Sequence, residues 1–461
     1  MKTINDIHKI YFIGIGGIGM SALARYFKGK GKEVSGYDRT ETALTKQLKE
    51  EGISVSYSDD AALIPKDADI VVYTPAIPKD HAGLVYYREN GYDLLKRSDV
   101  LGIITKSSFN ICVAGTHGKT TTTTMIAHIL RHSGYGCNAF LGGIAANYNS
   151  NFWSDERNVC VVEADEYDRS FLKLSPDIAI ITAMDPDHLD IYGTAEEMDK
   201  AFVEFAGRIK KGGVLISKLG LEKKGALHAD HHFSYALSNT TADITAVNIV
   251  SGNGGYVFDV KNRNVIIEKV NLNMGGLHNV ENATAAIAVA MQLGIEAQKI
   301  KAAVAAFRGV KRRFEYILSP SEGNEIVYVD DYAHHPAELE ALIKSAASLF
   351  SDKKCTVIFQ PHLFSRTKDF ADEFAQSLDL ADEVILLPIY PARELPLKGV
   401  TSAMIADRMK PGHVRIMEKN ELLNWIKETF KNKKNELLIT AGAGDIDKLV
   451  PEIKNILAVD K

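Results

Sequence analysis

The seven residues Gly115-Thr116-His117-Gly118-Lys119-Thr120-Thr121 are of the types that bind the phosphates of a nucleoside triphosphate. An apolar, strand-like run precedes them at 109–114, and the stretch 122–132 has the spacing of a helix. In such a unit, backbone amides hold phosphate oxygens, the lysine reaches the terminal phosphates, and a threonine hydroxyl binds Mg2+. Val113 stands where the usual phosphate loop has glycine, so a turn without a ligand is the alternative.

Acidic side chains follow two apolar runs downstream of this loop. The run 158–162 ends in Glu163-Ala164-Asp165-Glu166, and the run 178–182 leads to the acidic stretch 185–190, which contains His188. Carboxylates at the carboxyl end of a buried strand, beside a Lys-Thr loop, suit a Mg2+-nucleotide site. His188 suits a second metal site or phosphate chemistry. A solvated acidic loop and a structural histidine are the alternatives.

A second phosphate-binding pattern lies near the amino terminus. A buried strand over 9–13 leads into Gly14-Ile15-Gly16-Gly17-Ile18-Gly19, and a helix is expected to follow. This is a G-x-G-x-x-G sequence, and Asp38 ends the next strand where dinucleotide folds have a ribose-binding acid. The pattern predicts a Rossmann-like domain without fixing its ligand, and a simple tight turn is the alternative.

The order of the predicted elements indicates an α/β protein of three domains. A further strand over 69–73 ends at Thr74, on a loop expected at the same crevice as the glycines. Residues 213–272 are rich in strands, which are expected to extend the sheet of a central ATP-binding domain into a mixed sheet. Strands and helices then alternate again, as in a second Rossmann-like domain. The expected domains are 1–106, 107–310 and 311–461.

Four loops in the last third carry His, Arg, Asp or Gly directly after predicted strands. Because ligands of such sheets bind beyond the carboxyl ends of the strands, these loops indicate a site for a small anion. His334, His362 and Arg366 would hold a carboxylate, the arginine through its bidentate guanidinium. The four loops are 330–336, 360–366, 388–394 and 441–445.

Two asparagines, Asn279 and Asn282, stand three residues apart at the start of an Ala-rich helix. This spacing allows both side chains to face one way. Helix capping is the alternative for one of them, whereas the pair suggests a contact with a base or a substrate.

Composition narrows the functional classes. Hydrophobic residues make up 46% and charged residues 25% of the 461 residues, as in an ordinary soluble globular protein. The net charge of -5, without a long basic block, disfavours a nucleic-acid partner. No apolar run approaches the roughly 18 residues of a membrane span, and the early first strand leaves no room for a signal peptide. The four dispersed cysteines suggest a reducing compartment, so a cytoplasmic location is expected.

These motifs occur in the order found in the Mur ligase family, which the chain resembles over essentially its whole length. The resembling segments are 14–21, 115–121, 163–166, 331–336 and 360–362. The resemblance implies UDP-sugar-, ATP- and amino-acid-binding domains, and ATP and Mg2+ as cofactors. It implies peptidoglycan synthesis, and thereby a part in cell-wall biogenesis, cell shape and division. A monomer or homodimer is expected, since the sequence does not show the oligomeric state. The alanine-adding branch is the most similar, so L-alanine would join the lactyl carboxylate of UDP-N-acetylmuramate through an acyl phosphate.

The resemblance also implies a role for each matching residue. Lys119, His188 and Arg313 would be catalytic; Thr120 and Glu163 would hold one Mg2+ and His188 a second. The nucleotide-binding residues would be Gly115, Thr116, Gly118, Lys119, Thr120, Thr121, Asn279, Arg313 and Asp331. The UDP-sugar site would comprise Gly14, Gly16, Gly17, Gly19, Asp38 and Thr74. The contacts for the amino acid and the muramyl group would be Asn282, Tyr332, His334, His362 and Arg366.

Three alternatives remain open at this point. A recycling ligase would attach an intact murein tripeptide to the same nucleotide sugar. An NAD-dependent dehydrogenase would explain Gly14 to Asp38 but leaves the Lys119 loop and the histidine loops without a role. A nucleotide-driven conformational switch would suit three alternating domains but not the small-anion site.

Overall fold

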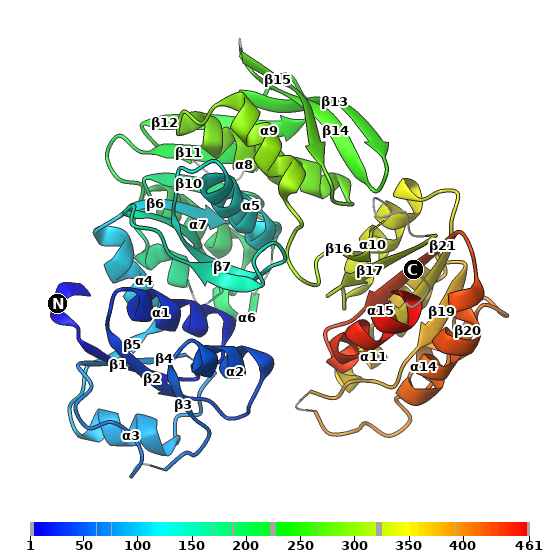
Figure 1. Ribbon diagram of the computed structural model, residues 1–461, viewed down its shortest axis with the longest axis horizontal. Coiled ribbons are helices and arrows are strands. Elements are labelled where there is room, and N and C mark those ends of the chain that lie inside the picture. Colours follow the sequence, from blue (N-terminus) through cyan, green and yellow to red (C-terminus); the bar gives the residue numbers. More distant parts are fainter. Residues whose placement is uncertain are drawn as a thin grey trace. The chain divides into compact units, whose positions relative to one another are not determined.

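The computed structural model describes residues 4–60, 62–74, 76–167, 169–186, 189–221, 227–263, 265–319, 325–392 and 394–458. Three sheets with helices between their strands confirm the expected α/β class (Figure 1). The chain divides into two compact units: Met1–Val247 with Asp259–Glu268 and Glu281–Val304, and Asn248–Phe258 with Lys269–Val280 and Ala305–Lys461. In the described ranges, no helix is both long and apolar enough to cross a membrane.

The N-terminal sheet has five parallel strands in the order β3-β2-β1-β4-β5. The strand order reverses between β1 and β4, which is the point where doubly wound sheets bind ligands. Its strands are β1 (Lys9–Ile13), β2 (Glu33–Tyr37), β3 (Ser54–Ser56), β4 (Ile70–Tyr73) and β5 (Leu94–Lys96). Its helices are η1 (Ile4–Asp6), α1 (Ile18–Gly29), α2 (Ala43–Glu50), α3 (Ala82–Glu89) and α4 (Arg97–Lys106).

Both faces of this sheet are buried, because successive side chains of β1 point to opposite sides. Phe12 belongs to the core that contains Leu23 and Phe27 of α1. Tyr11 belongs to a separate core with Tyr87 of α3, at a ring-centroid distance of 5.6 Å. This explains why β1 reads as a continuous apolar run rather than as an alternating one.

The central sheet has ten strands in the order β15-β14-β13-β12-β11-β10-β6-β9-β7-β8. Most of its pairs are parallel, but β7 and β8 are antiparallel, which confirms the mixed sheet. The strands are β6 (Phe109–Ala114), β7 (Asn138–Ala145), β8 (Ser150–Trp153), β9 (Val159–Glu163), β10 (Ile178–Ile181), β11 (Val214–Lys218), β12 (His231–Leu237), β13 (Ile244–Gly252), β14 (Gly255–Asn262) and β15 (Val265–Leu272). The helices are α5 (Lys119–His132), η2 (Ser170–Lys173), α6 (Leu189–Tyr192), α7 (Ala195–Ala206), α8 (Leu277–Gln292) and α9 (Ala297–Ala306).

A buried polar network fixes α1 against β8 of the central sheet. The Asn151 side chain is fully buried; its amide donates to Ser21 Oγ at 3.0 Å and to the Ile18 carbonyl, and its oxygen accepts from Arg25. Arg25 Nε in turn donates to Glu51 Oε2 at 2.6 Å. Each buried polar group in this network is paired, so the first turn of α1 has a defined position next to the central sheet.

The C-terminal sheet has six strands in the order β16-β17-β21-β18-β19-β20, all parallel except the edge strand β16. The strands are β16 (Glu315–Leu318), β17 (Ile326–Asp331), β18 (Lys354–Phe359), β19 (Glu383–Leu386), β20 (Val414–Ile416) and β21 (Glu436–Ala441). The helices are α10 (Pro336–Leu349), α11 (Phe364–Asp369), α12 (Ala371–Leu378), α13 (Ala403–Ala406), α14 (Lys419–Glu428), η5 (Phe430–Asn432), η6 (Asp445–Lys448) and α15 (Val450–Ala458).

Asp330, at the end of β17, is a buried carboxyl group inside this sheet. Its Oδ1 accepts from Thr440 Oγ1 at 2.6 Å and its Oδ2 from Arg312 Nε at 3.2 Å. Burial raises the pKa of Asp330 to about 7, although Arg312 opposes the shift. The folded chain therefore binds the proton of the Asp330 carboxyl group more tightly than the unfolded chain does. The resulting stabilisation is complete below the ordinary pKa of about 4 and is lost as the pH rises through about 7.

We expect Asp330→Asn, which mimics the protonated acid, to become more stable relative to the unmodified chain as the pH rises from about 5 to about 8. The relative gain should reach a few kcal/mol, at about 1.4 kcal/mol per unit of pKa shift. Thermal unfolding midpoints measured across this range test it, with the exposed Asp407→Asn as the control. A stability difference that stays constant with pH would show that Asp330 ionises normally.

Candidate active site

The loop between β6 and α5 has the backbone of a phosphate-binding loop. Gly115 and Gly118 have positive φ angles of 133° and 78°. A Cβ at Gly115 would lie 2.2 Å from Thr182 Oγ1, and one at Gly118 would lie 2.6 Å from Asn282 Oδ1, so both positions require glycine. The first amides of α5 have no partner within the helix and are available to phosphate oxygens.

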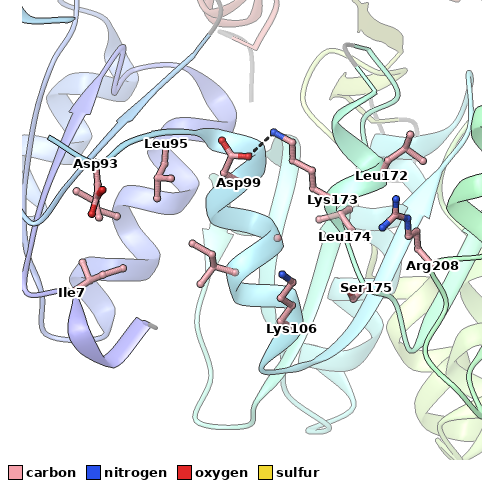
Figure 2. Close-up of a pocket in the computed structure, with 13 residues that line it drawn as sticks. Ile7, Asp93, Leu95, Asp99, Lys106, Leu172, Lys173, Leu174, Ser175 and Arg208 are labelled. Atoms are coloured by element: carbon pink, nitrogen blue, oxygen red, sulfur yellow. Dashed lines mark hydrogen bonds and ion pairs between the residues drawn. The ribbon is translucent and has the colours of Figure 1, made fainter. Parts of the chain in front are cut away.

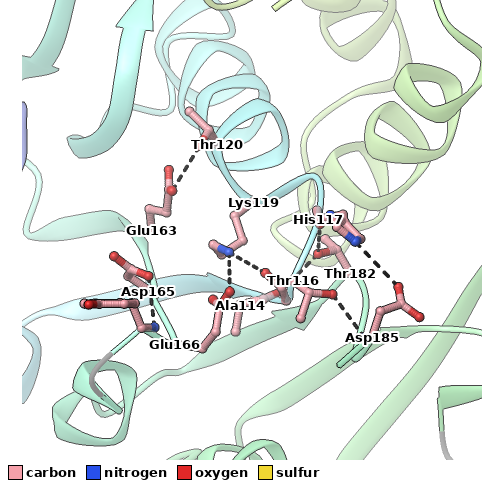
Figure 3. A network of polar contacts seen from close by, with 12 residues as sticks. Ala114, Thr116, His117, Lys119, Thr120, Glu163, Asp165, Glu166, Thr182 and Asp185 are labelled. Carbon is pink, nitrogen blue, oxygen red and sulfur yellow. Dashed lines mark hydrogen bonds and ion pairs between the residues drawn. The ribbon is translucent and has the colours of Figure 1, made fainter. Parts of the chain in front are cut away.

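Lys119 is held by two acceptors beside this loop (Figure 3). Its Nζ donates to the Gly115 carbonyl and to Glu166 Oε1, both at 2.7 Å. The Glu166 side chain is completely buried, and burial raises its pKa while Lys119 opposes the shift. Glu166 Oε2 is also buried and has no hydrogen-bond partner within the described ranges. The sequence placed Glu166 in the acidic motif but did not single it out as a site residue.

Thr120 and Glu163 provide two oxygen ligands of the kind that Mg2+ prefers. Thr120 Oγ1 donates to Glu163 Oε1 at 3.0 Å (Figure 3). Glu163 Oε2 accepts from the Gly142 amide at 3.0 Å, and a Cβ at Gly142 would come within 2.3 Å of that oxygen. The Gly142 backbone therefore holds the carboxylate in place, a role that sequence reasoning missed because β7 carries no motif. A bound Mg2+ would complete its coordination with phosphate oxygens and water.

His188, the predicted ligand of a second metal ion, lies outside the described residues, so the structure does not place it. Among the residues that are described, no group of three or more His, Cys, Asp and Glu side chains is positioned to hold a metal ion. The two-oxygen arrangement of Thr120 and Glu163 fits a metal that is also bound by the nucleotide.

The rest of the loop is tied to the segment that follows β10. The Asp185 amide donates to Thr116 Oγ1 at 3.1 Å, and His117 Nε2 lies 3.9 Å from Asp185 Oδ2. Thr121 is buried in the first turn of α5. Asn282 Oδ1 accepts from Thr122 Oγ1 at 3.2 Å, which places the predicted substrate contact directly beneath the phosphate loop.

Asn279, predicted to contact the nucleotide, lies in the second compact unit. Its side-chain amide donates to the Gly275 carbonyl at 2.7 Å. This contact joins the first turn of α8 to the segment before it. An N-cap would instead accept a hydrogen bond from a helix amide, so the contact does not test the capping alternative.

The N-terminal glycine loop is organised around Asp38. The Gly16 amide donates to Asp38 Oδ2 at 2.7 Å, and a Cβ at Gly16 would lie 2.8 Å from the same oxygen. Gly14 has φ 87° and lies against Thr74, whose Cγ2 would be 3.1 Å from a Cβ at Gly14. Gly17 is the N-cap residue of α1, so the first amides of this helix are the ones available to the predicted diphosphate. The amides of residues 14–17 already donate to Tyr37, Asp38 or Gly14.

Gly19, the last glycine of this motif, is explained by Arg97, which sequence reasoning missed. A Cβ at Gly19 would lie 2.6 Å from Arg97 Nη1, so a side chain there would displace the guanidinium from the first turn of α1. Arg97 Nη2 lies 3.9 Å from Asp165 Oδ2 in the acidic loop. Arg97 could have been found from its position directly after β5, because the other predicted ligands of this domain also follow the carboxyl ends of strands.

At the end of β17, Asp331 organises the segment that contains Arg313. Asp331 Oδ2 accepts from the Phe314 amide at 2.6 Å and Oδ1 from the Ala333 amide at 2.7 Å. Burial raises the pKa of Asp331 to about 6, and these amides and Arg313 oppose the shift. Arg313 is exposed, as is Tyr332, whose ring centroid lies 5.2 Å from the Arg312 guanidinium carbon.

The structure brings His334, His362 and Arg366 together on the C-terminal sheet. The two imidazole centroids are 6.1 Å apart, and His362 stacks on Tyr390 at 5.8 Å. Burial lowers the pKa of His334 and of His362, and Arg366 lowers both further. Two buried nitrogens in this cluster, His362 Nδ1 and Arg366 Nη1, have no partner in the described part of the chain. The unpaired N–H group of the guanidinium suits an anionic ligand.

The tautomer of His334 follows from its neighbours. Its Nδ1 lies 3.0 Å from the Tyr332 carbonyl oxygen and 3.3 Å from Glu338 Oε2, and both can only accept. Nδ1 therefore carries the proton, and in the neutral ring Nε2 keeps its lone pair. This nitrogen is able to accept a proton or a hydrogen bond from a ligand.

Comparison with known proteins covers nearly the whole chain. Residues 9–108 match the model of the Mur ligase family, catalytic domain, residues 113–290 the Mur ligase middle domain, and residues 312–444 the Mur ligase, glutamate ligase domain. A UDP-N-acetylmuramate--L-alanine ligase of Cytophaga hutchinsonii is 48% identical over 98% of this chain and 97% of its own length. The protein of that name from Phocaeicola vulgatus is also 48% identical, over 98% and 99%.

Solved structures agree with these relatives. The UDP-N-acetylmuramate-alanine ligase of Thermotoga maritima has a TM-score of 0.81 and 30% identity, with 98% of this chain and 100% of that chain covered. A murein peptide ligase of Psychrobacter arcticus has a TM-score of 0.67 and 25% identity, with 99% of each chain covered. With three consecutive family domains and these full-length relatives, the chain belongs to the Mur ligase family.

Proposed function

We propose that the protein joins L-alanine to the lactyl carboxylate of UDP-N-acetylmuramate, with ATP converted to ADP and phosphate. The observation that carries this proposal is the similarity, over 98% of the chain, to relatives that bear the name of this activity. We assign residues 1–106 to the UDP-sugar, 107–310 to ATP and 311–461 to the amino acid. The reaction is a step of peptidoglycan synthesis and thereby serves cell shape and division; we expect it in the cytoplasm, with the protein as a monomer or homodimer.

The phosphate loop supports the first half of this reaction. The lactyl carboxylate attacks the γ-phosphorus, ADP leaves, and an acyl phosphate remains. Two anions approach each other in this step, so positive charge must be concentrated at the transferring group. Lys119 would supply one charge, and Arg313 is proposed to supply another. Mg2+ held by Thr120 and Glu163, with His188 as the ligand of a second ion, would neutralise phosphate oxygens.

The C-terminal cluster supports the second half. The alanine amine attacks the acyl carbon, phosphate leaves with the former carboxylate oxygen, and the nitrogen loses a proton. Arg366 has an unpaired buried donor for the alanine carboxylate, and His362 an unpaired buried nitrogen beside it. The Nε2 lone pair of His334 is suited to accept the proton of the amine. Tyr332 and Asn282 remain proposed contacts of the muramyl group and amino acid, and Asn279 and Asp331 of the nucleotide.

The co-substrate requirement is the direct test of this function. Phosphate release at saturating ATP and Mg2+ is expected to need both UDP-N-acetylmuramate and L-alanine, with the alanyl product detected by mass. Release that occurs without either substrate would refute the proposal. Replacing L-alanine by the murein tripeptide tests the recycling activity, which we do not favour because the murein peptide ligase is only 25% identical to this chain.

Lys119→Ala is expected to abolish turnover, because it removes a positive charge from the transferring phosphoryl group. The same change leaves the buried Glu166 without its cation, so the thermal midpoint must be recorded beside kcat. Retention of more than about a tenth of kcat, roughly 1.4 kcal/mol in barrier height, would count against the role of Lys119.

Arg366→Ala is expected to raise KM for L-alanine at least about tenfold, since a charge-assisted pair to a carboxylate contributes about 1.5 kcal/mol or more. KM for ATP should change much less. Lys368→Ala, an exposed cation on the same helix α11, is the matched control and should leave both constants unchanged. Equal increases for ATP and L-alanine in Arg366→Ala would place this residue elsewhere in the reaction.

A further inference from the structure

A cavity of about 670 Å3 lies in the first compact unit, and Figure 2 shows the residues that line it. Ile7 and Asp93 precede β1 and β5, Ile70 begins β4, and Leu174 precedes β10. The cavity is therefore at the amino ends of these parallel strands. The glycine loop and Thr74 follow the carboxyl ends of β1 and β4, at the opposite edge. None of the proposed substrate contacts lines this cavity.

The walls of the cavity are mainly aliphatic. They come from both sides of a domain boundary, which is where small-molecule sites commonly occur, and the volume is within the usual range for such sites. The aliphatic lining residues are Ile7, Ile70, Leu95, Ile103, Leu172 and Leu174.

The charges at the cavity are unevenly compensated. Lys173 Nζ is 2.5 Å from Asp99 Oδ1, as Figure 2 shows, and Arg208 Nη2 is 2.7 Å from Glu204 Oε1. Lys106, the last residue of α4, has no ion-pair or hydrogen-bond partner in the described ranges. Asp93, the other carboxylate of the lining, is engaged in an interaction of its own. An apolar chamber in which the ammonium group of Lys106 has no partner is complementary to a molecule with an apolar body and a single negative charge.

We propose that this cavity is a second ligand site, which takes a small amphipathic anion: an apolar body within the chamber and one acidic group at Lys106. Such a ligand would lie between α4 and the segment that follows η2. The opposite end of α4 begins with Arg97, which crosses Gly19 of the glycine loop. Ser170 Oγ and the Phe171 amide of η2 donate to the Asp165 carbonyl at 2.9 and 3.1 Å. A bound ligand would therefore lie against α4 and the segment next to η2, which support the glycine loop and the acidic loop.

The test uses two fluorescent probes with the same aromatic body. 1-Anilinonaphthalene-8-sulfonate carries one sulfonate, and N-phenyl-1-naphthylamine carries none. The sulfonate is expected to bind the full-length chain saturably, with one site per chain, and more tightly than the neutral probe. Lys106→Gln should weaken binding of the sulfonate about fivefold, the size expected for one solvent-facing ion pair, and leave the neutral probe unchanged.

Two further variants separate this site from unspecific binding. Ile103→Trp fills the chamber from a half-buried position and should weaken both probes at least about tenfold. Lys427→Gln, in the last turn of α14, removes a comparable exposed lysine from another helix end and should change neither. Equal binding of the sulfonate to the unmodified chain and to Ile103→Trp would overturn the proposal, as would absence of saturable binding. Equal affinity of both probes would overturn the assignment of an anion. These titrations involve no substrate, so their outcome is independent of the proposed ligase activity.

Discussion

The contact between the Lys119 ammonium and the buried Glu166 carboxylate is the interaction on which the phosphate site depends. A largely buried ammonium group needs acceptors, and Glu166 and the Gly115 carbonyl provide two at 2.7 Å. Buried pairs of this kind add little net stability, because desolvation of both charges offsets their attraction. Their value is geometric: the ammonium is held at the loop rather than in solvent. Phosphate oxygens then compete for a cation that is already in position.

Glycine has the same purpose at four places in the first compact unit. At Gly16 and Gly142, the backbone amide donates to a carboxylate that a Cβ would displace. Gly115 and Gly118 have positive φ angles. The side chains of Thr182 and Asn282 lie within 2.6 Å of where their Cβ atoms would be. In each case the missing side chain makes room for a polar group from a distant segment. The glycines thus set the positions of the ligands as well as the path of the chain.

Local patterns were sufficient to predict the three sheets. Strands such as β1 and β9 are continuous apolar runs, and the predicted glycine and acidic loops lie at their carboxyl ends. Asn279 and Asn282, which lie in α8, do not follow this rule. The patterns could not identify contacts between distant segments. Gly142 is one residue of an unremarkable strand, and only the pairing of β7 with β9 brings its amide to Glu163. Arg97 needs the fold of the N-terminal domain before it can reach Gly19. The antiparallel edge strand β16 could not be predicted either, because Glu315–Leu318 is short and has no strong periodic signal.

The two adjacent acids at the end of β17 show why residue type alone does not define a role. Successive side chains of a strand point to opposite faces, so Asp330 turns to Thr440 within the sheet. Asp331 turns to the amides of Phe314 and Ala333. Each oxygen of Asp331 accepts only one of these hydrogen bonds, and a carboxylate oxygen has two lone-pair positions. Asp331 can therefore hold the segment around Arg313 and still accept a hydroxyl group of a ribose. Asp330, enclosed by Thr440 and Arg312, is buried and has no comparable access to a ligand.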